Sequence, residues 1–217
     1  IYEESKYTAE TLIRSAGFEK LNVYRPGSVT GDWLTGATTT YHGVYLFAQF
    51  TQLARQRSGA GPGERWHHPV RLFQNGDEAH HLIPVDAISR AIVTILRQEN
   101  LAGETYHLTP DQACSARELE AALADYFGYH GVTFAGNQCV DRGTMNEVEQ
   151  IFYDTISRAE HRYSAGDPQF DCTNTKRVVP AWRGSRIDHD YLLRIFDYAV
   201  QQRFGRGRVK TRSAKVA

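Results

Sequence analysis

The chain has 217 residues, of which 41% are hydrophobic and 23% are charged. This balance is typical of a globular protein with one large or two small domains. Lys plus Arg and Asp plus Glu each number 25, so the net charge is zero, which argues against a nucleic-acid or membrane-surface binder. There is no run of about 18 apolar residues, so no membrane-spanning helix is expected. Three cysteines without metal-ligand spacing, and no signal peptide, predict a reduced, cytoplasmic protein.

The first helix is expected at residues 2–16, where apolar residues recur with the helical period and Gly17 provides a stop. This helix places Tyr2 and Lys6 four residues apart, on one face, with Cβ atoms about 5–6 Å from each other. An ammonium so close lowers the pKa of a phenol from its usual value of about 10. The pair can therefore donate and accept a proton. Taken alone, the same spacing also fits an exposed helix surface without a catalytic role.

A short apolar strand is expected at 21–24, and the loop 25–32 leaves its carboxyl end, where ligands bind in open α/β sheets. Ser115 and Glu118 form a capping-box pattern at the start of a later helix. The further helices are expected at 43–56, 85–98, 115–127, 144–163 and 188–204. The further strands are expected at 70–73, 81–84, 105–108 and 132–134, the first two as a hairpin around the turn 74–77.

Only about two of these strands look like strands of a parallel sheet, which is too few for a free-standing doubly wound sheet. The chain also starts with Ile1, within about one residue of a helix. We therefore expect it to be the later part of a longer polypeptide whose first part supplies the partner strands.

Several separated segments, in order, resemble extended short-chain dehydrogenase/reductases. Tyr2–Glu10 resembles their Y-x-x-S-K-x-x-A-E segment, and Arg25–Asp32 resembles their R-P-G-x-V-x-G-D turn. Three later segments, 81–89, 106–109 and 170–176, resemble the return to the nucleotide fold, the following strand and the late F-D-x-x-N-T element. Thr30-Gly31-Asp32 with Thr35-Gly36 is most similar to the thioester-reductase-like, or male-sterility, branch.

The resemblance implies an α/β fold: the C-terminal part of a Rossmann-type, doubly wound parallel sheet with a mostly helical substrate-binding region. Residues 1–36 and 80–113 would belong to the dinucleotide-binding domain, and residues 37–79 and 114–204 to the substrate-binding region. Residues 205–217 form a basic tail that is expected to be disordered.

The implied function is that of an NAD(P)-dependent oxidoreductase that reduces a carbonyl or a thioester. Tyr2 and Lys6 would be the catalytic pair, and no metal is expected. The implied cofactor-binding residues are Tyr2, Lys6, Pro26, Gly27, Ser28 and Val29. The implied substrate-binding residues are Ser28, Thr39, Thr40, Tyr41 and His42.

The family's glycine-rich phosphate loop, its NAD-or-NADP selector and the Ser/Thr partner of the tyrosine have no counterpart in these residues. The choice between NADP and NAD therefore stays open. The expected partners are a small-molecule or carrier-bound acyl substrate and the missing N-terminal Rossmann half, on this or another chain. The isolated 217-residue chain is expected to be inactive. Two alternatives remain: a sugar-nucleotide epimerase or dehydratase with the same pair, and a non-catalytic scaffold.

Two other patterns have simpler interpretations. The pairs His67-His68 and His80-His81 lack the spacing of zinc ligands and fit polar strand positions. The aromatic stripe of Tyr45, Phe47 and Phe50 is expected in the core rather than in a pocket.

Overall fold

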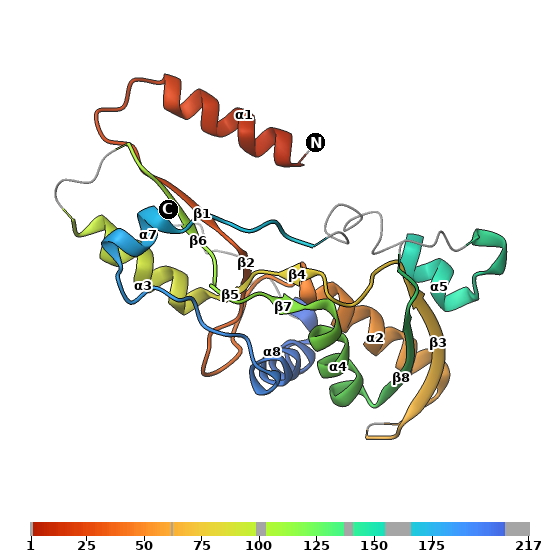
Figure 1. Cartoon of the computed structure of the whole chain (residues 1–217). Coiled ribbons are helices and arrows are strands. Elements are labelled where there is room, and N and C mark those ends of the chain that lie inside the picture. Colours follow the sequence, from red (N-terminus) through yellow and green to blue (C-terminus); the bar gives the residue numbers. More distant parts are fainter. Residues whose placement is uncertain (1, 62, 99–102, 137–140, 155–165, 207–217) are drawn as a thin grey trace, which may run out of the picture.

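The computed structural model describes residues 2–61, 63–98, 103–136, 141–154 and 166–206, and the side chain of Tyr2 lies outside this description. The helices are α1 Tyr2–Ser15, α2 Val44–Ser58, α3 Val85–Leu96, α4 Ala116–Phe127, α5 Glu147–Phe152, α7 Thr173–Val178 and α8 His189–Gln201, with 3-10 turns η1 Arg142–Thr144 and η3 Arg203–Gly205. The strands are β1 Val23–Pro26, β2 Ser28–Thr30, β3 Trp66–Leu72, β4 Ala79–His80, β5 Leu82–Pro84, β6 Thr105–Leu108, β7 Cys114–Ser115 and β8 Tyr129–Phe134 (Figure 1).

Parallel strand pairs beside α3 confirm the expected α/β fold. β1 pairs in parallel with β6, and β2 pairs in parallel with β5. β1 and β2 follow one another with only Gly27 between them, and α3 connects β5 to β6, as a crossover between parallel strands requires. The side chains buried between this helix and the strands are Ile83, Ala87, Ile88, Ala91, Ile95, Tyr106, Leu108 and Trp182.

A second core lies under β3 and β8, which also pair in parallel. The Trp66 and Tyr129 rings stack across this pair with centroids 4.4 Å apart. Helices α2, α4 and α8 bury their apolar faces against one another in this core; Tyr191, Ile195 and Phe196 of α8 are fully buried. The right-hand part of Figure 1 shows this second unit beside the parallel strands.

The expected hairpin between residues 70–73 and 81–84 is wrong. β3 pairs with β8, whereas β5 pairs with β2. The turn between them is present, because the Glu78 carboxylate accepts hydrogen bonds from the backbone N–H groups of Asn75 and Gly76. That turn leads into the short antiparallel pair β4–β7 instead of back along β3.

Capping side chains determine where two of the helices begin. The Ser115–Glu118 capping box is confirmed at the start of α4. The helix expected from residue 144 begins later, at Glu147, because Asn146 forms a capping box with Glu149 there. The remainder of that expectation, 155–163, lies outside the described residues. Within the described part of the chain, no helix is long and apolar enough to cross a lipid bilayer.

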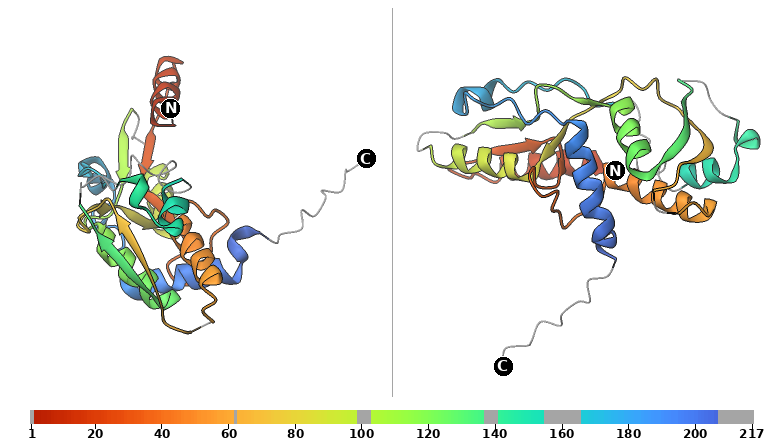
Figure 2. Two further views of the ribbon diagram at one scale, coloured as in Figure 1. Left: turned by 90° about the vertical axis from the view of Figure 1, so that its right-hand side faces the viewer. Right: turned by 90° about the horizontal axis from the view of Figure 1, so that it is seen from below.

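Helix α1 projects away from the rest of the molecule, as Figures 1 and 2 show. Polar contacts hold it to the parallel strands: the Glu10 carboxylate accepts hydrogen bonds from Arg14 and Arg25, and Arg14 donates to Thr105. Its apolar face is exposed, with Leu12 65% and Ile13 47% accessible. The periodicity therefore predicted the helix, but the described residues do not cover its apolar side.

Candidate active site

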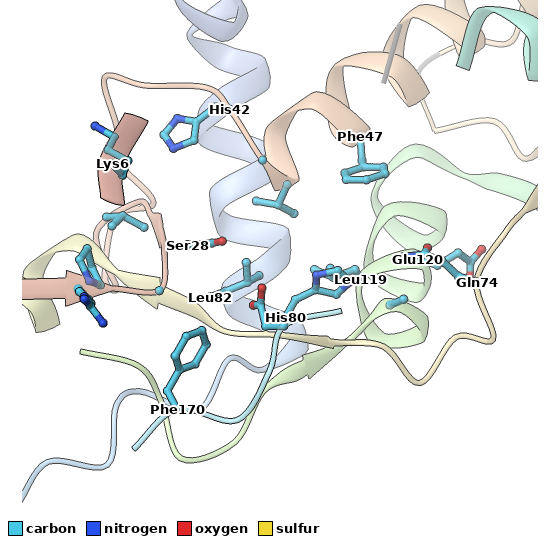
Figure 3. Close-up of a pocket in the computed structure, with 18 of the residues that line it drawn as sticks. Lys6, Ser28, His42, Phe47, Gln74, His80, Leu82, Leu119, Glu120 and Phe170 are labelled. Carbon is cyan, nitrogen blue, oxygen red and sulfur yellow. The ribbon is translucent and has the colours of Figure 1, made fainter. Parts of the chain in front are cut away.

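One large cavity, of about 1570 Å³, runs from α1 across the β1–β2 turn into the space between the helices α2, α4 and α5. Figure 3 shows its two ends: Lys6, Ser28 and His42 lie at one end, and Gln74 and Glu120 lie at the other. The cavity thus connects the segment that resembles a catalytic helix to the second core.

The catalytic pair is described only in part. Lys6, on exposed α1, lines the cavity. Tyr2 begins the same helix, but its side chain lies outside the described residues. The geometry of the Tyr2–Lys6 pair therefore stays a prediction from helical spacing.

The turn between β1 and β2 forms the floor beside Lys6. Pro26, Gly27, Ser28 and Val29, the expected cofactor-binding residues, all line the cavity. The Ser28 N–H donates to the His81 carbonyl oxygen over 2.9 Å, and the Gly27 N–H donates to Leu108 over 3.1 Å. A Cβ at Gly27 would lie 2.3 Å from that His81 oxygen, so the two backbones meet at a distance only glycine permits.

We expect Gly27→Ala to lower the free energy of unfolding by about 1–3 kcal/mol, because overpacking forces the two strands apart. Urea unfolding measures the change. Gly143→Ala is the matched control, since the atom nearest to its added Cβ lies at an ordinary 3.4 Å. Equal stability of the two variants would contradict the steric role of Gly27.

Only part of the expected substrate-binding loop lines the cavity. His42 lines the cavity with Ser28, whereas Thr39, Thr40 and Tyr41 are not among its described lining residues. The Thr40 N–H donates to the Thr38 hydroxyl, and the Tyr41 ring packs against Tyr45 with centroids 5.6 Å apart. The loop therefore turns Tyr41 toward the core.

Two polar side chains lie in the wall of the cavity between its two ends. His80 and Asp167 line it, and the Asp167 carboxylate accepts a hydrogen bond from the His81 backbone N–H over 2.7 Å. Burial lowers the pKa of His80, although the carboxylates of Asp167 and Glu78 oppose this. The lowered pKa favours the neutral imidazole of His80, in which one ring nitrogen donates a hydrogen bond and the other accepts one. No group of three or more potential metal ligands comes together among the described residues.

The sequence of this half of the site matches a known family. Residues 1–92 match the family described as male sterility protein, an NAD-binding domain. This part of the chain is similar to the male sterility protein family. The comparison with curated proteins found no match.

Solved structures share a similar fold over most of the chain. The terminal R domain from the myxalamid PKS-NRPS biosynthetic pathway is 24% identical, with a TM-score of 0.62, and the alignment covers 94% of this chain and 50% of that one. RMD from Pseudomonas aeruginosa, complexed with NADPH, is 18% identical with a TM-score of 0.53, over 91% of this chain and 55% of that one. UDP-glucose 4-epimerase from Thermotoga maritima is 17% identical with a TM-score of 0.50, over 92% and 52%. The fold is that of extended short-chain dehydrogenases/reductases, and the chain spans about half the length of these structures.

Two buried tyrosines form hydrogen bonds with the backbone of the Thr30-Gly31-Asp32 segment. The Gly31 N–H donates to the Tyr45 hydroxyl oxygen over 2.9 Å, and the Tyr191 hydroxyl donates to the Gly31 carbonyl over 2.8 Å. The Asp32 carboxylate accepts hydrogen bonds from the backbone and hydroxyl of Thr35, which hold the pKa of Asp32 below its ordinary value. These hydrogen bonds hold residues 30–32 in place, and none of the three is among the described residues that line the cavity.

Sequence reasoning missed the apolar lobe, the part of the cavity that lies between α2, α4, α5, β3 and β8. Phe47 and Phe50, expected in the core, line this lobe, whereas Tyr45 is buried as expected. The other apolar lining residues of the lobe are Val44, Val70, Leu72, Phe73, Leu119, Leu123, Tyr129, Val132, Phe152 and Tyr153. Hydrophobic periodicity finds such residues but cannot distinguish a cavity wall from a filled core.

Proposed function

We propose that this chain is part of an NAD(P)-dependent oxidoreductase that reduces a carbonyl or a thioester on an apolar, acyl-type substrate. One observation carries the proposal: a single cavity joins Lys6 and the turn Pro26–Val29 to a large apolar lobe. A reacting carbonyl beside Lys6 would leave the rest of the substrate in that lobe, where burial of apolar surface favours binding.

The residues present fit the nicotinamide end of the cofactor. Pro26, Gly27, Ser28 and Val29 all line the cavity, as Lys6 does. The cofactor supplies hydride transfer when bound. Tyr2 would donate a proton to the oxygen that gains negative charge. The Lys6 ammonium would lower the pKa of Tyr2 and hydrogen-bond the nicotinamide ribose.

The proposal includes a partner segment that supplies the phosphate-binding half of the Rossmann fold. Two features of the described residues support it. The apolar face of α1 is exposed at Tyr7, Leu12 and Ile13, and β1 pairs along one edge with β6. A further parallel strand beside β1, on the side opposite to β6, would cover the second edge of β1 and the apolar face of α1. The segment would precede these residues or lie on another chain.

A substrate screen on the protein with its phosphate-binding half tests the function. We expect NADPH or NADH oxidation with acyl thioesters or aldehydes, and none from the 217-residue chain alone, because its pyrophosphate site is elsewhere. Turnover of nucleotide sugars without net cofactor oxidation would instead establish an epimerase. Absence of any turnover and of NAD(P)H binding would indicate a scaffold protein.

A further inference from the structure

The far end of the apolar lobe carries a carboxylate. Glu120 lies on α4 between Leu119 and Leu123, and all three side chains line the cavity. In Figure 3 Glu120 and Gln74 occupy the end opposite to Lys6. Gln74 follows β3, so two different elements bring polar side chains to this end. Aliphatic and aromatic residues of α2, β8 and α5 form the walls between the two ends.

The Glu120 carboxyl is influenced by burial and by charged neighbours rather than by a hydrogen bond from a described residue. Burial is the main influence on its pKa and raises it, whereas Arg117 and His130 lower it and Asp125 raises it. Arg117 is committed elsewhere: it donates to the Asn75 carbonyl over 2.9 Å, and its guanidinium lies 4.8 Å from the centre of the Phe134 ring. No hydrogen bond from a described residue is among the influences on the Glu120 carboxyl.

The Glu120 carboxylate lines the cavity and has no hydrogen bond to a described residue, so it can bind a donor group of a ligand. An ionised carboxylate only accepts hydrogen bonds, so its complement is a donor, and an ammonium group adds charge attraction.

We propose that Glu120 determines specificity by binding an amine at the distal end of the substrate. The substrate class is then an aliphatic or aromatic acyl or carbonyl compound with a protonated amino group remote from the reacting carbon. The inference rests on the proposed function for the identity of the reacting end. The binding of the distal amine depends only on the apolar lobe, which described residues of this chain form.

Binding of unreactive ligand pairs tests the proposal without turnover. The probes are ω-amino amides of six, eight and ten carbons, each paired with the unsubstituted amide of equal length, titrated at pH 7 by calorimetry against the protein with its phosphate-binding half and without cofactor. We expect the amino amide of the best-fitting length to bind at least about tenfold more tightly than its partner, as a hydrogen bond to a charged group provides.

The Glu120→Gln variant keeps the shape of the side chain and should abolish the tenfold preference while leaving the affinity for the unsubstituted amide unchanged. Asp125→Asn, on the same helix, is the matched control for loss of a negative charge and should retain the preference. Equal affinity for both amides, an unchanged preference in Glu120→Gln, or no binding of any probe would each overturn the proposal. Because no cofactor is present, failure of the proposed reductase activity would not produce these results.

Discussion

In the protein with its phosphate-binding half, Tyr2→Phe should lower the rate of NADPH oxidation by about 100-fold or more. The variant loses the hydroxyl that would protonate the substrate oxygen, and general acid catalysis contributes about 10²–10⁴ in rate. The cofactor's dissociation constant should change little, because in the proposed site its main contacts would be made by the phosphate-binding half and by Lys6. Steady-state rates and NADPH fluorescence titration measure the two quantities.

Tyr198→Phe removes a hydroxyl on α8, outside the residues that line the cavity, and serves as the control. Lys6→Gln gives an independent check of the pair. Loss of the ammonium should raise the pKa of Tyr2, so the pH of half-maximal rate for the tyrosinate-dependent oxidation direction should move upward. Near-normal turnover in Tyr2→Phe would show that another group moves the proton.

The features that the sequence predicted best are those with a local physical cause. Ser115 and Glu118 fix the start of α4 through hydrogen bonds within four residues. The spacing of Ile88, Ala91 and Ile95 predicts the buried face of α3. Lys6 and Gly27 belong to motifs whose residues are close in the sequence, and both line the cavity, although their roles stay predictions.

The features that were missed depend on contacts between distant segments. The partner of β3 is β8, about 60 residues later, and nothing in the turn at 74–77 excludes the nearer strand. Likewise, Leu119 and Phe47 approach one lobe only after α2 and α4 have packed. The resemblance implied that Tyr41 binds the substrate, but its ring packs against the aromatic rings of Tyr45 and Phe204.

The ion pair between Arg71 and Glu149 lies beside the apolar lobe and should contribute strongly to the stability of the folded protein. Glu149, on α5, is 1% exposed and accepts hydrogen bonds from the Arg71 backbone and guanidinium, over 2.7–2.9 Å. The Glu149 carboxylate also accepts a hydrogen bond from the Asn146 backbone N–H, which completes the capping box of α5. These contacts connect α5 to β3 directly behind Phe152 and Leu72, which line the lobe.

Glu149→Gln should therefore lower the free energy of unfolding by about 2–3 kcal/mol at pH 7, somewhat less than for a fully buried pair because Arg71 is 36% exposed. Urea unfolding measures the loss. Arg142→Gln breaks the exposed ion pair with Asp154 nearby and should cost less than about 1 kcal/mol. Similar losses in the two variants would show that the Arg71–Glu149 pair contributes no more than a surface contact.

The pH dependence of the same pair gives a second, independent test. The hydrogen bonds from Arg71 lower the pKa of Glu149 from 4.5 to about 2 in the folded protein. Because the folded-state pKa lies below that of the unfolded chain, the contribution is complete above about pH 4.5 and is lost as the pH falls toward 2. The stability difference between the wild type and Glu149→Gln should therefore be constant from pH 7 to 5 and should shrink below pH 4.5. A difference that stays constant down to pH 2.5 would show that the variant acts through packing, since only the charged carboxylate can lose its advantage on protonation.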